Sequence, residues 1–320
     1  MEQEKRRPWR RWVVLVLMIV GWIVGSIIIP VQPEISVKPE NLLGEGGMWF
    51  GFLPAVNTLT SLALTLVVVI LLAWFAGRSL KKSQNSDLVP QGIGNAMEAF
   101  FEMLYNMTEN ATGTKWVRAV FPWFATIMFY VLLANLLKLI PGFESIGVFH
   151  HAEEGHVGHA ISGALLQPGE GEYILVPFLR GVSVDLNFTL AIALISVVMT
   201  QVIGIRAQGM RYFSKFFNTE RMFKVPFFGA MDFLVGLLET ISELSKVISF
   251  AFRLFGNMFA GVVLVAIVAG LLGKISILPA MIMLFELFVG VIQAFVFGML
   301  TMVFMAQATQ GHGEEHAEAH

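Results

Sequence analysis

The sequence contains no cysteine and little charge. Only 14% of its 320 residues are charged, 56% are hydrophobic, and the formal net charge is −2. A soluble domain carries roughly 25% charged residues, so the composition excludes a soluble enzyme, a disordered protein and a basic nucleic-acid binder. The missing cysteines exclude a disulfide framework, a thiol nucleophile and a cysteine-ligated metal. What remains is a polytopic membrane protein that lies in a lipid bilayer.

Six apolar stretches are long enough to cross a bilayer, which takes about 20 residues. They cover residues 12–30, 52–76, 117–140, 186–205, about 227–272 and about 275–307. Segment 91–113 instead alternates apolar residues with glutamates at helical spacing, which predicts an amphipathic helix on the cytoplasmic membrane face. We therefore predict an all-α polytopic membrane protein. It has about six membrane helices, one amphipathic interfacial helix and a long, strongly tilted C-terminal helix hairpin.

The loop charges predict an orientation. Lys and Arg gather at 5–11, 78–82, 115–118 and 206–224, whereas the other loops are poor in them. By the positive-inside rule, both termini are cytoplasmic. We divide the chain into residues 1–50 (an N-terminal anchor span and outer loop), 51–308 (the membrane domain) and 309–320 (a His/Glu-rich tail). The first span also fits a cleaved secretory signal, although no clear cleavage site follows it.

All seven histidines fall in two tracts, and neither tract matches a known metal-binding helix motif. They are His150, His151, His156, His159, His312, His316 and His320. Imidazole and carboxylate groups suit zinc, so a metal site is one reading. A solvated loop and a solvated tail are the other. We adopt the second, and expect no metal and no cofactor.

A polar stripe interrupts the fifth apolar stretch. At 100° per residue its members fall within an arc of about 120° on one helical face: Glu239, Ser242, Glu243, Lys246, Ser249, Arg253 and Asn257. A charge at membrane depth is costly and marks a functional residue by default. Arg253 lies far from both ends of the stretch, so we expect it to face a water-filled cavity or a carboxylate of a partner. The alternative is an internal ion pair, for instance with Glu286.

The last apolar stretch carries Glu286 and Gln293 on one helical face. A glutamate can accept and release protons, whereas the guanidinium of Arg253 keeps its charge. The two residues therefore predict different roles. Glu286, with the serines, Asn257 and Gln293, can line a proton-conducting path. Arg253 is a fixed positive charge that can attract a partner's carboxylate and stop cations from leaking straight across.

The run SFAFRLFGNMFAG at residues 249–261 resembles the signature of subunit a of F-type ATP synthases. Residues 122–142, which contain Asn135-Leu136 and Leu139-Ile140-Pro141-Gly142, resemble the same family. So do residues 185–189 and 293–295, in the same order along the chain. The resemblance covers most of the chain from about residue 50 onward. The first span lies outside it.

The resemblance implies a non-catalytic stator subunit beside a rotating ring of c subunits in an energy-coupling plasma or inner membrane. Two offset half-channels would pass protons to and from the ring during ATP synthesis, with Arg253 as the barrier between them. Other partners would be peripheral-stalk b subunits, and we prefer H⁺ to Na⁺ as the ion. The residues implied at half-channel positions are Asn257, Ser249, Glu239, Glu286 and Gln293, with Asn135 and Asp185 on the inlet side.

Two positions depart from the family pattern. Val262 stands where many members hold an acid or histidine that partners the group at the Glu286 position, so Glu286 lacks that neighbour. Lys138 stands where some members carry an acid near the inlet. A stand-alone ion transporter or channel remains the alternative function. It would gain support if Glu239, Glu243 or Glu286 neutralised Arg253 within the chain.

Overall fold

We describe the protein from a computed structural model. The described residues are 12, 13, 16, 19, 38–44, 46–49, 51, 53–84, 93–140, 143–152, 158–162, 165–167, 171–216, 226–272 and 278–310. The predicted N-terminal span and the histidine-rich tail therefore lie almost wholly outside the described residues.

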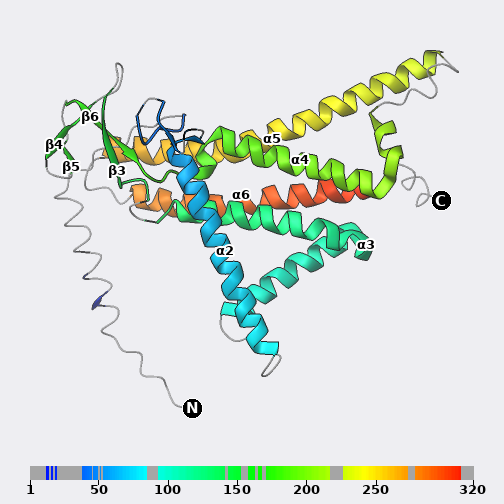
Figure 1. Cartoon of the computed structure of the whole chain (residues 1–320), viewed down its shortest axis with the longest axis horizontal. Helices are drawn as coiled ribbons and strands as arrows, with labels where there is room; N and C mark the ends of the chain where they lie inside the picture. Colours follow the sequence, from blue (N-terminus) through cyan, green and yellow to red (C-terminus); the bar gives the residue numbers. More distant parts are fainter. Residues whose placement is uncertain are drawn as a thin grey trace.

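Five long helices dominate the described structure: α2 (Asn57–Gln84), α3 (Ile93–Leu137), α4 (Leu186–Gln208), α5 (Pro226–Leu272) and α6 (Leu278–Thr309). Each contains a segment long and apolar enough to cross a membrane. The prediction of an all-α, multi-pass membrane protein is confirmed, and five such helices are consistent with a count of about six. In Figure 1, α4, α6 and the second halves of α3 and α5 run side by side, the beginning of α5 extends away from them, and α2 crosses them steeply.

Helix α3 bends sharply at Gly113, whose φ of 75° and ψ of 165° are not helical. A positive φ is accessible to glycine at little steric cost. The bend divides α3 where the sequence analysis separated an amphipathic segment from a span. The first half folds back on the second through ring contacts, with centroids 5.7 Å apart for Phe101–Phe129 and 5.3 Å for Tyr105–Phe121.

The core lies between α3, α4, α5 and α6. Its larger cluster includes Val131, Ala193, Leu254 and Ala294, all at most 1% exposed. Small residues allow close helix approach, as is common in membrane bundles. A Cβ atom at Gly298 of α6 would lie 2.6 Å from Cβ of Met128 on α3. The α3–α6 contact is therefore tight enough to fix how the two helices lie against each other.

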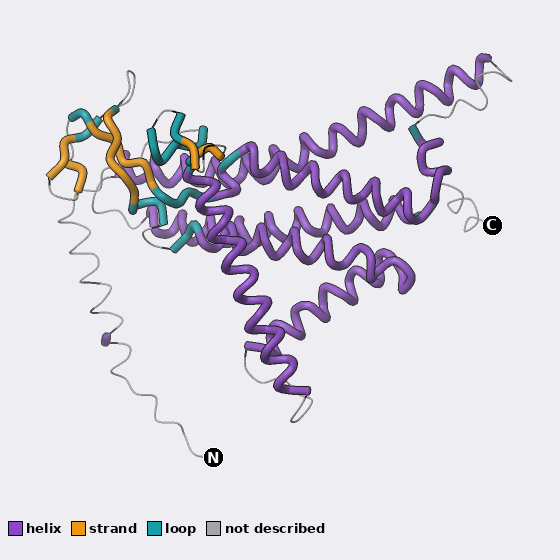
Figure 2. Tube along the Cα trace, viewed as in Figure 1, coloured by secondary structure: helices purple, strands orange, loops and turns teal. Residues whose placement is uncertain are grey.

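Short strands form at one end of the helices, as Figure 2 shows in orange. The three antiparallel pairs are β1 (Met48–Trp49) with β2 (Leu53–Pro54), β3 (Gly147–His151) with β6 (Tyr173–Pro177), and β4 (Ala160–Ser162) with β5 (Leu165–Gln167). The apolar patterning of the sequence did not predict these strands, because a strand of two to five residues is too short to form a long apolar run.

The described histidines contact other residues of the outer segment, by which we mean the described residues within 38–56 and 143–185 that join the long helices. Nε2 of His150 lies 3.2 Å from the Leu42 carbonyl oxygen, and the ring centroids of His151 and Tyr173 are 4.6 Å apart. Within the described ranges, no group of three or more His, Asp or Glu residues gathers to hold a metal ion. His156 and the three tail histidines lie outside those ranges.

Candidate functional site

Helices α5 and α6 form an antiparallel hairpin with a constant register. The rings of Phe250 and Phe297 are 5.2 Å apart, and further along Gly261 faces Glu286. Phe250 and Gly261 are 11 residues apart on α5 (261 − 250), and their partners Phe297 and Glu286 are also 11 apart (297 − 286) but run in the opposite direction along α6. By this register, Gln293 lies beside the turn of α5 that carries Arg253.

The polar stripe of α5 lies on the border between its buried and exposed faces. Ser242, Ser249, Arg253 and Asn257 are exposed, and Glu239 is half-buried. Glu243 is turned inward and is only 8% exposed. The stripe therefore divides into an outward row that contains Arg253 and an inward group that contacts neighbouring helices.

Arg253 makes no hydrogen bond or ion pair with any other residue in the described part of the chain. The nearby buried carboxylates have different cationic partners: Lys246 for Glu243 and Lys138 for Glu286. The alternative that Glu286 neutralises Arg253 is therefore not what the structure contains. The guanidinium is left exposed on the outer surface of α5, where a second molecule can reach it.

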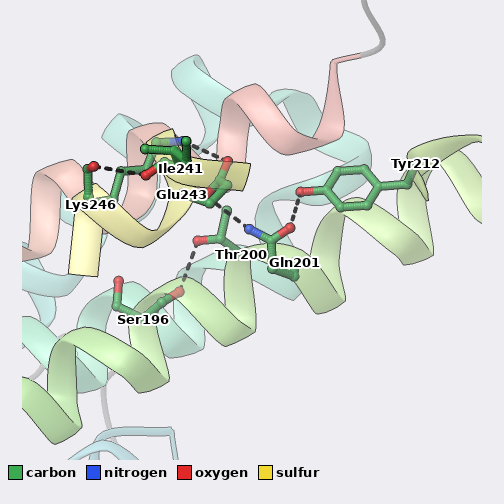
Figure 3. Close-up of polar contacts among 8 residues, drawn as sticks. Ser196, Thr200, Gln201, Tyr212, Ile241, Glu243 and Lys246 are labelled. Carbon is green, nitrogen blue, oxygen red and sulfur yellow. Dashed lines mark hydrogen bonds and ion pairs between the residues drawn. The ribbon is translucent and has the colours of Figure 1, made fainter. Parts of the chain in front are cut away.

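Glu243 and Lys246 are the inward group of the stripe. They belong to a hydrogen-bonded network, shown in Figure 3, that joins α5 to Gln201 of α4 and to Tyr212 just after α4. The Tyr212 hydroxyl donates to Oε1 of Gln201 at 2.6 Å, and Gln201 donates to Oε2 of Glu243 at 3.0 Å. Lys246 donates to Oε1 of Glu243 at 2.8 Å and lies 4.7 Å from the Phe304 ring centroid. Both oxygens of Glu243 are thus satisfied within the chain, which favours a structural role for this residue.

A second buried ion pair joins the end of α3 to α6. Nζ of Lys138 lies 2.5 Å from Oε1 of Glu286, and their side chains are 3% and 8% exposed. A buried charge pair needs good geometry to offset the cost of desolvation. The predicted site residue Glu286 therefore has a charged partner, although Val262 packs against the apolar core and cannot supply one.

Asn135 connects this pair to the neighbouring elements. Its amide nitrogen donates to the Gly290 carbonyl at 3.0 Å, one turn of α6 after Glu286. Its carbonyl oxygen accepts from the Ser183 hydroxyl at 2.6 Å, in the 3₁₀ helix η1 (Val182–Val184). The structure therefore brings the predicted residues Asn135 and Glu286 to the same corner.

Asp185 lies next to this corner and caps α4. Oδ1 accepts from the Asn187 backbone amide at 2.8 Å, and Oδ2 accepts from the Thr58 hydroxyl at 2.9 Å. An aspartate N-cap typically stabilises a helix by about 1 kcal/mol. The residue also ties α4 to α2, so its carboxylate has a structural role whether or not it takes part in proton movement.

The pairing of Glu286 with Lys138 was not predicted from the sequence. Lys138 stood out only as a departure from the family pattern, although a charge at membrane depth usually has a partner. The sequence gives no indication, however, of which carboxylate that partner is, because residues 138 and 286 meet only through packing of α3 on α6. Gln201 and Tyr212 were missed for the same reason.

Comparison with known proteins agrees with this architecture. The family model for the ATP synthase A chain matches residues 59–306. The chain is similar to ATP synthase subunit a of Mycobacterium bovis, 30% identical over 269 residues that cover 84% of this chain and 92% of the relative. It is also similar to ATP synthase subunit a of Campylobacter jejuni subsp. doylei, 30% identical over 256 residues covering 78% and 90%. The chain therefore belongs to the ATP synthase subunit a family, whose members are multi-pass membrane subunits of the Fo sector.

Proposed function

We propose that this chain is the stator of the Fo proton channel and that Arg253 separates two offset half-channels beside a ring of c subunits. The observation that carries the proposal is the position of Arg253. Its guanidinium is exposed on α5, while Glu243 and Glu286 are bound to lysines. A permanent cation without an internal partner is suited to pair with a carboxylate that passes by on a neighbouring molecule.

The positions of the other candidates support an offset between the two paths. Glu239 precedes Arg253 on α5 by roughly 21 Å at 1.5 Å per residue, and Gly261, which faces Glu286, follows it by roughly 12 Å. On this proposal, Glu286, Gln293, Asn257, Asn135 and Asp185 line the outer path, and Glu239 and Ser249 line the inner one. A proton crossing from one path to the other must then travel on the ring.

The energetics require such a barrier. One charge that moves through ~100 mV releases about 2.3 kcal/mol, and a continuous water path would dissipate that energy. A fixed guanidinium repels a proton in water, yet it lets a neutral, protonated ring site pass. The direction of rotation then follows the proton gradient. Peripheral-stalk b subunits would hold this chain against the turning ring, and H⁺ is the ion we propose.

Replacement of Arg253 tests the proposal. Arg253→Ala should abolish proton-driven ATP synthesis in membrane vesicles while the assembled complex persists, because the ring carboxylate loses its partner. Arg118→Ala is the matched control, since Arg118 is also exposed but lies on α3 away from the stripe. Normal coupled synthesis in Arg253→Ala would contradict the proposal. Proton conduction by the purified chain alone in liposomes would favour the stand-alone channel instead.

A further inference from the structure

The Lys138–Glu286 pair lies inside the molecule at the outer end of the helix bundle. Both side chains are almost fully buried, and their charged atoms are 2.5 Å apart. Lys138 directly follows α3 and Glu286 lies in α6, so the two residues are far apart in the sequence. The pair is therefore a product of the fold, and it places a fixed positive charge directly on the group proposed to carry protons.

The backbone of α5 closes one side of this pair. A Cβ atom at Gly261 would lie 2.6 Å from Oε1 of Glu286 and 2.9 Å from its carboxyl carbon. A side chain at position 261 would push the carboxylate out of this position. Glu286 is therefore held between the ammonium of Lys138 and the helix that carries Arg253.

The outer segment closes the other side. A Cβ atom at Gly181 would lie 3.1 Å from Cδ of Lys138 and 3.4 Å from Oε1 of Glu144. Glu144 itself accepts a hydrogen bond from the Gly181 amide at 2.9 Å and is half-buried. Gly181 thus lies close to both the lysine stem and the Glu144 carboxylate, on the side of the pair away from α5.

Lys138 and Arg253 therefore have different roles, since Lys138 is paired inside the chain and Arg253 is exposed. A buried carboxylate without a countercharge is strongly disfavoured. An ammonium supplies three donors and no acceptor, so it pairs with the anionic form of Glu286 and holds it in place. Arg253 lies about two turns of α5 before Gly261 and remains available for the ring.

We propose that Lys138 is a positioning residue that acts through Glu286 on the outer path. It holds the Glu286 carboxylate as an anion against α5, ready to accept a proton. A hydronium ion on the outer side then protonates the carboxylate, leaving water, and the resulting acid passes a proton along the outer path, past Gln293 and Asn257, to an anionic carboxylate of the ring. Lys138 keeps its own protons throughout. This inference rests on the proposed function.

A double-mutant cycle tests it. Passive proton flux is measured in vesicles that carry the assembled Fo sector without its catalytic part, and is normalised to the amount of assembled Fo. Glu286→Gln should lower the flux by roughly tenfold or more because it removes a proton-transfer group, and Lys138→Met should do so by leaving that group out of position. The double variant should conduct no worse than Glu286→Gln, because Lys138 acts only through Glu286. Lys138→Arg, which keeps the charge, should retain more flux than Lys138→Met.

The other lysine–glutamate pair provides the control. Lys246→Met breaks the pair with Glu243, roughly 22 Å along α5 from Gly261. Its effect should multiply with that of Glu286→Gln, as independent sites do. Wild-type flux in Lys138→Met, or multiplied losses in the Lys138→Met/Glu286→Gln double variant, would overturn the inference.

Whether the variant chains assemble into the Fo sector also tests the inference. Lys138→Met leaves a buried anion, so a failure of this variant to assemble agrees with the pairing if the neutral double variant assembles. Failure of the double variant would overturn the inference, because Lys138 would then serve something other than Glu286. A defective Arg253→Ala together with a normal Lys138→Met would overturn this inference and leave the proposed function intact.

Discussion

Gly261 on α5 lies directly against the carboxylate of Glu286 on α6. A Cβ atom at position 261 would be 2.6 Å from Oε1 and 2.9 Å from the carboxyl carbon of Glu286, closer than real Cβ contacts. The carboxylate is also bound to Lys138, so it cannot move away without disturbing that pair. Because the buried carboxylate is held between Gly261 of α5 and Lys138, position 261 is a sensitive probe of the outer path.

Gly261→Ala should lower proton flux by about tenfold, since the added methyl displaces the Glu286 carboxylate from Lys138. A tenfold change corresponds to about 1.4 kcal/mol. Flux per assembled complex in vesicles is the measurement. Gly77→Ala on α2 is the matched control, because a Cβ there meets nothing within 4 Å. Equal flux in the two variants would count against a role of Glu286 in conduction.

Gly298→Ala should destabilise the subunit without a specific effect on conduction. The new methyl would meet Cβ and Cγ of Met128 at 2.6 and 2.8 Å, where α3 and α6 pack. Overpacking of this kind costs about 1–3 kcal/mol. Thermal inactivation of the purified complex should occur at a lower temperature than for Gly77→Ala. A variant as stable as that control would show that the two helices pack less closely than described.

Tyr212→Phe should remove one hydrogen bond from the network around Glu243 and lower stability by about 1 kcal/mol. The hydroxyl that is lost donates to Gln201 at 2.6 Å. Tyr105→Phe is the control, because within the described residues the Tyr105 side chain makes a ring contact but no hydrogen bond. Chemical or thermal unfolding of the complex should separate the two variants. Equal unfolding would mean that the network contributes nothing measurable.

Two substitutions at Asp185 can separate its role as the N-cap of α4 from its negative charge. Asp185→Ala should lower stability by about 1 kcal/mol through loss of the α4 N-cap, whereas asparagine is an equally good cap. Asp185→Asn should therefore keep the stability of the complex. If the carboxylate lies on the inlet side of the proton path, as proposed, proton flux through the complex that carries Asp185→Asn should fall. An Asp185→Asn variant with unchanged flux would leave Asp185 as a structural residue only.

The sequence was sufficient for the membrane class, the helices and the motif around Arg253. Apolar length and loop composition are local properties, so α2, α4, α5 and α6 follow from the chain directly, and Gly113 marks the break in α3. Helical periodicity picked out the candidates on α5 and α6, and the family resemblance assigned roles to them. These signals do not depend on which helices touch.

The partners of the charges could not be predicted. Helical periodicity placed Glu243 on the same stripe as Arg253, yet packing turns it toward Gln201 and Lys246. Glu286 was weighed as a partner of Arg253, and the fold gives it Lys138. Such pairs are decided by how helices lie against one another, and a single sequence does not contain that information.

The central claim is that Arg253 faces a carboxylate of the ring. The most direct measurement is a structure of the assembled membrane complex that resolves what lies next to the Arg253 guanidinium. We expect a ring carboxylate within about 4 Å, the reach of an ion pair, on the surface where Arg253, Ser249 and Asn257 are exposed. Arg253 neutralised by Glu239, Glu243 or Glu286 of its own chain, with the ring elsewhere, would contradict the account.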